Sequence, residues 1–279
     1  MDQRYDFPGV ATVTGAASGI GQATAIAFAR SGCRKIALLD RDESGLAETR
    51  TQILAITKTN QRPCEVEVIP FDVTSAESVA SAYSSIRQKF GRIDYAVQCA
   101  GIVVFGSSTE TSIEDFDKAI SVNYRGLWLC TRQILQVMTD QTLDAEAFPD
   151  ANIPSARAQR GSIVNLSSDL AYNAQPNTVA YIGSKGAVTA LTRADAMDFV
   201  GQKIRVNCVL PGIVDSPMTK PTPEVREWLE NNAVRETPAK RFGLPEEIAD
   251  VAVFLASNKA SFVTGANWAV DGGRLAGHC

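Results

Sequence analysis

Seven short runs of mostly apolar residues recur along the chain, and stretches with a helical pattern of apolar positions separate them. The apolar runs cover residues 10–13, 35–39, 66–70, 93–98, 161–166, 204–209 and 267–270. The helical stretches include residues 76–90, 116–138, 179–199 and 245–255. Strands that alternate with helices are typical of a parallel sheet covered on both faces. We therefore predict a single α/β domain over residues 1–279, with a doubly wound, Rossmann-like sheet of about seven strands.

One long stretch, residues 139–160, interrupts this alternation. It is polar, contains Pro149 and Pro154, and shows little periodicity. A segment of this length without regular structure is usually a surface loop, a functional loop or a partner contact. We interpret it as a polar insert at the surface, and its role stays open.

The first apolar run leads into a glycine-rich turn and then into an alanine-rich helical stretch, residues 22–30. Gly15 permits a tight turn, Gly19 lets the backbone approach a pyrophosphate, and Gly21 lets the helix pack closely on the strand. The start of the helix presents free N–H groups to phosphates. This order of elements predicts a dinucleotide site. The Gly-x-x-x-Gly-x-Gly spacing departs from the common fingerprint, and an ordinary glycine turn is the alternative.

The second apolar run ends at Asp40, about 20 residues after the last glycine of the turn, where dinucleotide sites carry an acidic residue. A carboxylate there accepts hydrogen bonds from the adenosine ribose hydroxyls and repels a 2′-phosphate. Arg41 is the complication, because a guanidinium beside the ribose can bind that phosphate. The pattern favours NAD as the cofactor, and NADP is the alternative.

Tyr181 and Lys185 stand one helical turn apart, so their side chains share one face of the predicted helix. An ammonium beside a phenol lowers the pKa of the phenol, which would make Tyr181 a proton donor and acceptor near neutral pH. Ser168 follows the apolar run 161–166 and can donate to a substrate oxygen, whereas Ser167 is the weaker candidate. Taken alone, the Tyr181–Lys185 spacing is weak evidence, because a solvated surface pair is by far the more common explanation of such a spacing.

Together these motifs resemble the short-chain dehydrogenase/reductase family, from about residue 8 to about residue 274. The matching segments are Thr14–Gly21, Asp72-Val73, Ala100-Gly101, Asn123, Ser168, Tyr181 with Lys185, Pro211-Gly212, 263–265 and Asp271-Gly272-Gly273. One departure is Gln98-Cys99-Ala100-Gly101, where the family usually has Asn-Asn-Ala-Gly. Gln98 would then brace the sheet only imperfectly.

The resemblance implies a role for each of four catalytic residues. Tyr181 would be the general acid and base, and Ser168 would polarise the substrate oxygen. Lys185 would lower the pKa of Tyr181 and hold the nicotinamide ribose, while Asn123 would position a water molecule behind it. The implied cofactor contacts are Gly15, Ser18, Gly19, Ile20, Gly21, Asp40, Arg41, Asp72, Val73, Ala100, Gly101, Tyr181, Lys185, Pro211, Gly212, Ile213 and Ser216.

The resemblance further implies a substrate-binding loop and helix in residues 212–242. Its candidate apolar walls, which core packing explains equally well, are Val103, Phe105, Met218, Trp228 and Leu229. We expect NAD-dependent oxidation of a secondary alcohol, with a hydrophobic or cyclic small molecule as substrate, such as a terpenoid, steroid-like or polyketide alcohol. The alternatives are NADPH-dependent ketone reduction, a redox-neutral epimerase, dehydratase or cyclase, and a non-catalytic nucleotide sensor. A homodimer or homotetramer would form through the helices that contain Asn123 and Tyr181.

Composition agrees with a cytoplasmic enzyme. The net charge of −4 gives no basic footprint for nucleic acid or an anionic membrane. No apolar run approaches the ~20 residues of a membrane span, and the first residues lack the apolar core of a signal peptide. Six scattered cysteines without a Cys-x-x-Cys pair argue against a disulfide framework. The one histidine, His278, argues against a zinc site or a Ser-His-Asp hydrolase, so we expect no metal.

Overall fold

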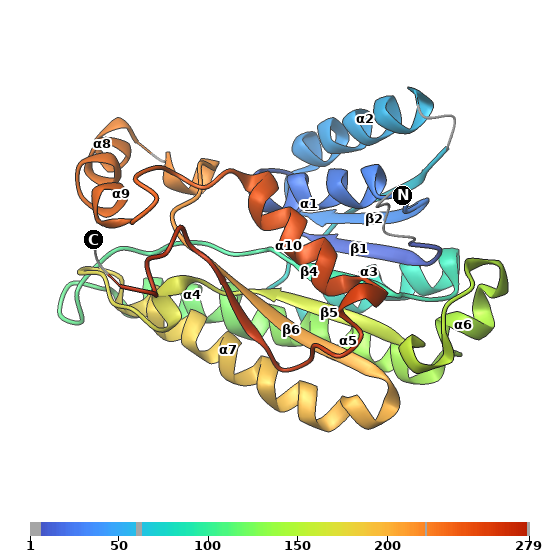
Figure 1. Ribbon diagram of the computed structural model, residues 1–279. Helices are drawn as coiled ribbons and strands as arrows, with labels where there is room; N and C mark the ends of the chain where they lie inside the picture. Colours follow the sequence, from blue (N-terminus) through green and yellow to red (C-terminus); the bar gives the residue numbers. More distant parts are fainter. Residues whose placement is uncertain (1–6, 60–62, 221, 278–279) are drawn as a thin grey trace.

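Parallel strands form one sheet, and helices cover both of its faces (Figure 1). The computed structural model describes residues 7–59, 63–220 and 222–277, and within them the sheet has seven strands in the order β3-β2-β1-β4-β5-β6-β7. The strands are β1 (Val10–Thr14), β2 (Lys35–Asp40), β3 (Glu65–Pro70), β4 (Tyr95–Gln98), β5 (Gly161–Leu166), β6 (Ile204–Pro211) and β7 (Asn267–Val270). Each strand overlaps a predicted apolar run, so the predicted α/β fold is confirmed.

The register of the strands brings the chemistry-bearing turns to one edge of the sheet. Thr14 of β1 pairs with Leu39 of β2 and with Gln98 of β4. The same row continues through Asn165 of β5 and Cys208 of β6. Because all these strands are parallel, the turns that follow this row emerge at the same carboxyl edge. The glycine turn, the end of β2 and the segments after β4 and β5 therefore lie close together.

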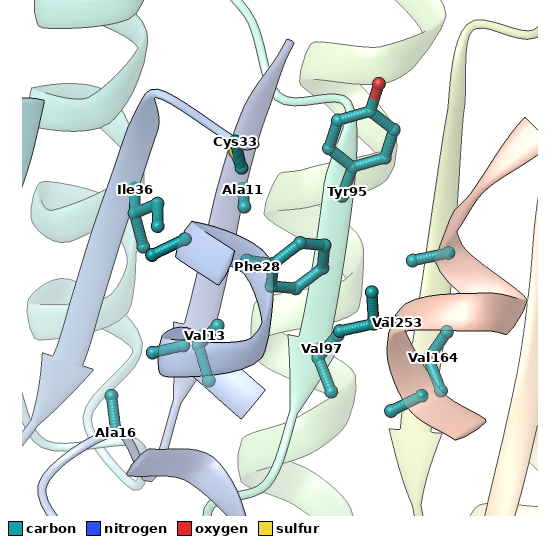
Figure 2. Close-up of a cluster of buried hydrophobic side chains, with 14 of the residues drawn as sticks. Ala11, Val13, Ala16, Phe28, Cys33, Ile36, Tyr95, Val97, Val164 and Val253 are labelled. Atoms are coloured by element: carbon teal, nitrogen blue, oxygen red, sulfur yellow. The ribbon is translucent and has the colours of Figure 1, made fainter. Parts of the chain in front are cut away.

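Three helices cover one face of the sheet: α1 (Gly19–Arg30), α2 (Glu43–Thr59) and α10 (Pro245–Ala256). Their core includes Phe28 of α1 and Val253 of α10, packed with strand side chains such as Val97 (Figure 2). Phe7 meets the rings of Phe28 and Tyr95 edge-on, at centroid distances of 5.2 and 4.8 Å. This packing fixes α1, and with it the start of the helix that follows the glycine turn.

The opposite face is covered by α3 (Ala76–Phe90), α5 (Leu127–Asp140) and α7 (Val179–Phe199). The bounds of α3 and α7 agree with the helices predicted from periodicity. Local signals explain those of α3: the Ser75 side chain accepts a hydrogen bond from the Ser78 amide, and Gly91 ends the helix at a φ of 78°. The apolar stripe of α3 packs on the sheet through Tyr83 and Ile86, which are fully buried.

The helix predicted over residues 116–138 is interrupted. Helix α4 (Ile113–Ile120) starts after Ser112, which caps the Asp115 amide, and a π-helical turn, η1 (Ser121–Gly126), joins it to α5. The turn ends at Gly126, where a Cβ would stand only 2.7 Å from the Val73 side chain. Such π-helical turns occur often at functional sites, and this one contains the predicted site residue Asn123.

The insert at 139–160 lies largely at the surface, but it has structure of its own and long-range hydrogen bonds hold it against the domain. It forms α6 (Asp144–Ala147) and two 3₁₀ turns, η2 (Pro149–Ala151) and η3 (Ser155–Arg157). The Asp144 carboxylate accepts hydrogen bonds from the Gln159 amide at 2.9 Å and from the Asn258 side chain at 3.0 Å. Buried Arg205 donates to the Gln159 side chain at 2.9 Å. These long-range bonds replace the apolar periodicity that the segment lacks.

Short elements gather over the carboxyl edge of the sheet (Figure 1). They are η4 (Asp169–Ala171), η6 (Pro217–Thr219), α8 (Pro223–Asn231) and α9 (Ala233–Glu236). The remaining 3₁₀ turns are η5 (Val200–Gln202) and η7 (Asn258–Ala260). Among the described residues, no helix is both long and apolar enough to cross a membrane.

Candidate active site

The turn between β1 and α1 forms a cradle made of backbone, which we call the glycine cradle (residues 14–21). Gly15 and Gly19 adopt positive φ angles of 68° and 54°, which side-chain-bearing residues rarely adopt. A Cβ at Gly21 would overlap the Gly15 carbonyl group. Ser18 precedes α1, but its side chain makes no capping hydrogen bond, and the first turn holds no acidic residue. The first N–H groups of α1 are therefore available to an anion such as a phosphate.

A cavity of about 570 Å³ runs from this cradle along the carboxyl edge of the sheet. At one end, the Asp40 carboxylate accepts hydrogen bonds from the Ala17 amide at 3.2 Å and the Asp42 amide at 3.1 Å. Arg41 beside it is exposed and lines the same cavity. The predicted cofactor residues that line this cavity are Gly15, Ser18, Gly19, Ile20, Gly21, Asp40, Arg41, Asp72, Val73, Ala100, Gly101 and Ser216.

Asp72 lies at the same cavity, after β3. Its carboxylate accepts hydrogen bonds from the Thr74 amide at 2.8 Å and from the Thr74 hydroxyl at 2.7 Å. These two bonds, with a smaller contribution from Arg41, lower the pKa of Asp72. The uncapped helix start, the crowded glycines and the two carboxylates together fit a dinucleotide with its pyrophosphate at α1 and its adenosine between Asp40 and Asp72.

A smaller cavity of about 150 Å³ continues from the first one. The two cavities share the lining residues Ile20, Cys99, Gly101, Ser216 and Met218. The predicted site residues around the smaller cavity are Ile20, Gly101, Ser168, Tyr181, Lys185, Pro211, Gly212, Ile213 and Ser216. We call it the reaction cavity, because it brings the predicted proton-transfer residues next to the larger cavity that begins at the glycine cradle.

The predicted apolar walls of the reaction cavity are mostly in place. Val103, Phe105, Met218 and Leu229 line it, whereas Trp228 does not. Helix α8 directs Leu229 inward, and the Trp228 side chain stays 45% exposed over a separate surface hollow. Adjacent positions on a helix point about 100° apart, so only one of the two can face the cavity. The prediction for Trp228 was therefore wrong.

Lys185 sits behind Tyr181 on α7, one turn further along the helix. Its ammonium lies 5.8 Å from the centre of the Tyr181 ring and donates to the Leu166 carbonyl oxygen at 2.9 Å. Lys185 is buried, and burial lowers its pKa to about 8. The ammonium therefore stays mostly protonated at neutral pH, facing the junction of the two cavities.

The pKa of Tyr181 has the opposite direction to the one predicted. Burial raises it to about 12, the neighbouring Ser168 hydroxyl lowers it, and the negative charge of Asp169 raises it. The desolvation of the phenolate outweighs the attraction expected from Lys185, whose ammonium is turned toward the Leu166 carbonyl. Ser168 is thus the neighbour that offsets part of this rise, because its hydrogen bond lowers the pKa of Tyr181.

Asn123 is the predicted site residue that lines neither cavity. It is fully buried in the π-helical turn, where its side chain accepts from the Ile102 amide at 2.8 Å and donates to the Ile102 carbonyl at 2.9 Å. It also donates to the Ser184 hydroxyl at 3.0 Å. A Cβ on Gly101 would touch both the Asn123 amide oxygen and the Lys185 ammonium, so Asn123 lies close behind the cavity wall.

Comparison with known proteins agrees with this geometry. A family model described as enoyl-(acyl carrier protein) reductase matches residues 15–274. The short-chain dehydrogenase fogB of Aspergillus ruber is 38% identical over 96% of this chain and 97% of its own length. The chain belongs to the short-chain dehydrogenase/reductase family. It is therefore an oxidoreductase of a family that uses NAD or NADP and acts on small molecules.

Other members of the short-chain dehydrogenase/reductase family carry both directions of the chemistry in their names. The 2-(S)-hydroxypropyl-CoM dehydrogenase 3 of Xanthobacter autotrophicus is 34% identical over 96% of both chains. The crystal structure of levodione reductase superimposes with a TM-score of 0.84 at 28% identity, covering 97% of this chain and 99% of that one.

This short-chain dehydrogenase/reductase also carries the departure at Gln98. The Gln98 side chain donates to the Thr131 hydroxyl at 2.7 Å and to the Asn165 side chain at 2.9 Å. Gln98 therefore links β4 to α5 and β5, as a brace would. Its amide oxygen is buried without a hydrogen-bond partner. The brace is imperfect in that one atom.

Two charged residues that line the reaction cavity were not predicted from the sequence: Asp169 and Arg274. Each stands directly after a recognised motif, Ser168 in one case and Asp271-Gly272-Gly273 in the other. The sequence did show a charged residue next to each motif. It gave no sign that Asp169 and Arg274, which are 105 positions apart, form a pair. Among the described residues, no group of three or more His, Cys, Asp or Glu side chains could hold a metal ion.

Proposed function

We propose that this protein is an NAD-dependent dehydrogenase that oxidises a secondary alcohol to a ketone, reversibly. The observation that carries the proposal is the meeting of Ser168, Tyr181 and Lys185 in a cavity that opens into the groove of the glycine cradle. A non-catalytic nucleotide sensor would need the cradle but not this arrangement. The nicotinamide, when bound, supplies the carbon that accepts or donates the hydride.

Proton transfer is the task of the protein. Tyr181 accepts the proton of the alcohol during oxidation and returns it during reduction. Ser168 donates a hydrogen bond to the same substrate oxygen and stabilises its developing charge. Lys185 keeps a positive charge beside the phenol and at the ribose end of the cavity, and Asn123 holds the backbone of Ile102 behind it.

Asp40 supports NAD as the preferred cofactor. Two backbone amides orient its carboxylate at the end of β2, where it can receive both ribose hydroxyls and repel a phosphate. The second candidate is an NADPH-dependent ketone reductase, which exposed Arg41 at the same end of the groove favours. The remaining cofactor contacts follow the residues that line the two cavities, with Ile213 and Ser216 at the nicotinamide end.

The substrate is proposed to be a hydrophobic or cyclic small molecule. The walls of the reaction cavity support this, because Val103, Phe105, Met218 and Leu229 are apolar. The levodione reductase match is consistent with such a substrate, and so is a dehydrogenase named for a 2-hydroxypropyl group. A redox-neutral epimerase, dehydratase or cyclase would use the same cavity without net turnover of the cofactor.

Assembly and location remain part of the proposal. Family members are commonly oligomeric, and we propose a homodimer or homotetramer through the face of α4, α5 and α7. Exposed Phe116, Trp128 and Met197 on these helices support it. Light scattering of the wild-type protein and of Trp128→Glu tests it, since a charge in the interface should dissociate the assembly. The cytoplasmic location stays a prediction from the sequence.

The first experiment is a titration of the purified protein with NADH and with NADPH, followed by nicotinamide fluorescence. We expect at least a tenfold preference for NADH, about 1.4 kcal/mol. A panel of cyclic and acyclic secondary alcohols is then assayed with NAD⁺. Preference for NADPH would make the reductase the leading interpretation, and cofactor binding without net oxidation or reduction would favour a redox-neutral reaction.

A further inference from the structure

The C-terminal segment reaches back into the reaction cavity. After β7, the Asp271 carboxylate accepts hydrogen bonds from the Gly273 amide at 2.9 Å and the Leu275 amide at 2.8 Å, which forms a tight turn. This turn buries Arg274 against Asp169, with 2.7 Å between a guanidinium nitrogen and the carboxylate. The side chains are only 7% and 2% exposed. A buried ion pair thus stands beside Ser168, made by two residues that are 105 positions apart in the chain.

Asp169 contacts the hydroxyl that the reaction needs. Ser168 Oγ donates to the Asp169 carboxylate at 3.1 Å and accepts from the Leu170 amide at 3.2 Å. A serine hydroxyl has one proton to donate. That proton is therefore directed either to Asp169 or to an oxygen in the cavity. The stronger the Asp169 carboxylate is as an acceptor, the less readily the Ser168 hydroxyl turns its proton toward the cavity.

Arg274 sets that acceptor strength. Burial raises the pKa of Asp169, and Arg274 is the strongest of the groups that lower it. The other oxygen of the carboxylate carries the Arg274 contact, so the charge that Ser168 meets is partly neutralised. The same neutralisation weakens the effect of Asp169 on the Tyr181 phenol, whose pKa it raises.

Few other charges face Tyr181. Lys185 does so from its own helix, and Cys99, which follows β4, lines the same cavity. Asp169 faces it from η4, and Arg274 from the C-terminal segment. Among the described residues that line the reaction cavity, these are the titratable ones. Asp271 acts only indirectly, because its negative charge raises the pKa of Asp169.

We propose that Asp169 and Arg274 are positioning residues, which hold the Ser168 hydroxyl and release its proton toward the substrate oxygen. This inference rests on the proposed function, because it gives the pair a task in proton transfer. Arg274 donates to one oxygen of the Asp169 carboxylate, and the Ser168 hydroxyl donates to the other. The Leu170 amide donates to the serine oxygen and so holds it in place. The pair is electrically neutral as a whole, so it orients the serine without placing a net charge in the apolar cavity.

Opposite shifts of one pH profile test the pair. At saturating NAD⁺, whose nicotinamide cation would favour the phenolate and lower the pKa of Tyr181 from its value in the cofactor-free protein, kcat/KM for the alcohol rises with pH as Tyr181 loses its proton. Arg274→Met leaves the Asp169 anion unpaired, which should move that rise upward by about one pH unit and lower kcat at least tenfold. Asp169→Asn leaves a cation unpaired and should move it downward by about one unit. The double variant should return within about 0.3 units of the wild type, and Arg274→Lys should restore most of kcat.

A purely structural role would give a different result. Breaking a buried ion pair from either side destabilises the fold, but structural damage has no reason to shift a pKa in opposite directions. Melting temperature and NADH binding of each variant measure the damage separately. Shifts of equal sign, or no shift in variants that fold, would overturn the proposal. If Arg274→Met does not fold, Asp169→Asn and Arg274→Lys still carry the comparison.

Direct titration of Tyr181 separates this inference from the proposed function. Labelling tyrosine with ¹³C at Cζ gives an NMR signal for Tyr181 in the NAD complex, assigned by its loss in Tyr181→Phe. The signal should titrate at higher pH in Arg274→Met and at lower pH in Asp169→Asn. If wild-type protein oxidises no alcohol, the proposed function fails, and these titrations still support or overturn the effect of the pair on Tyr181.

Discussion

The two ends of the candidate site are built in different ways. The glycine cradle is made of backbone from one strand, one turn and the start of one helix, and its conformation depends on where side chains are absent. The reaction cavity is made of side chains from η4, α7 and the C-terminal segment, and it depends on which atoms they bring together. The first end should be sensitive to any added Cβ, and the second to the loss of single polar atoms.

The largest effect is expected at the reaction cavity. Tyr181→Phe removes the proton acceptor and should lower kcat about 10³-fold, with NADH binding unchanged within about twofold. Tyr172→Phe is the matched control, because exposed Tyr172 makes its hydrogen bonds with Asn267 and Arg193 outside the cavity. Steady-state kinetics and a fluorescence titration measure both quantities. Normal turnover of Tyr181→Phe would show that the acid and base is another group.

The glycine cradle should be disrupted by any added side-chain atom, because its backbone is closely packed. A methyl group at Gly21 overlaps the Gly15 carbonyl, so Gly21→Ala should reduce the free energy of unfolding by about 1–3 kcal/mol and weaken NADH binding. The control is the same substitution at exposed Gly183 of α7, where a Cβ meets nothing within 4 Å. Gly183→Ala should stabilise the helix by about 1 kcal/mol. Urea unfolding measures the free energy of unfolding of both variants. If Gly21→Ala stabilised the protein as Gly183→Ala does, the cradle would not be tightly packed.

Cofactor choice depends on one side chain beside the backbone cradle. Asp40→Ser should weaken the affinity for NADH about tenfold, which corresponds to about 1.4 kcal/mol, and should strengthen the binding of NADPH. Arg41→Ala is the counterpart, because it removes the exposed cation and should weaken NADPH while leaving NADH unchanged. Fluorescence titrations of both variants with both cofactors measure this. An unchanged preference in Asp40→Ser would mean that the ribose contacts another group.

Local signals explain which parts of the fold could be predicted. Strand and helix bounds follow from apolar periodicity, and α3 from the Ser75 cap and Gly91 as well. The π-helical turn was not predicted, because residues 116–138 were interpreted as one continuous helix and the sequence gives no separate signal for the turn. The folded structure of the insert at 139–160 was not predicted, because polar long-range hydrogen bonds, such as that from Arg205 to Gln159, hold it in place. Sequence patterns carry little information on such contacts.

The site divides in the same way. The residues of the cradle follow each other in the sequence, so their spacing is sufficient to predict them. Spacing along the chain singled out Ser168, Tyr181 and Lys185, family resemblance gave their roles, and the structure brings them together. The direction of the Tyr181 pKa and the partner of Arg274 depend on burial and on distances between remote segments. Spacing along the chain reports neither.

The smallest expected effect concerns the apolar wall, where two neighbours on α8 differ in direction. Leu229 lines the reaction cavity and is buried, whereas Trp228 faces a surface hollow. Leu229→Ala removes apolar contact with the substrate and should raise KM for a hydrophobic alcohol about fivefold, about 1 kcal/mol. Trp228→Ala, although it deletes the larger side chain, should leave KM within about twofold. A larger change of KM in Trp228→Ala than in Leu229→Ala would mean that substrate approaches over the outer face of α8. The reaction cavity would then extend beyond the walls that its side chains define.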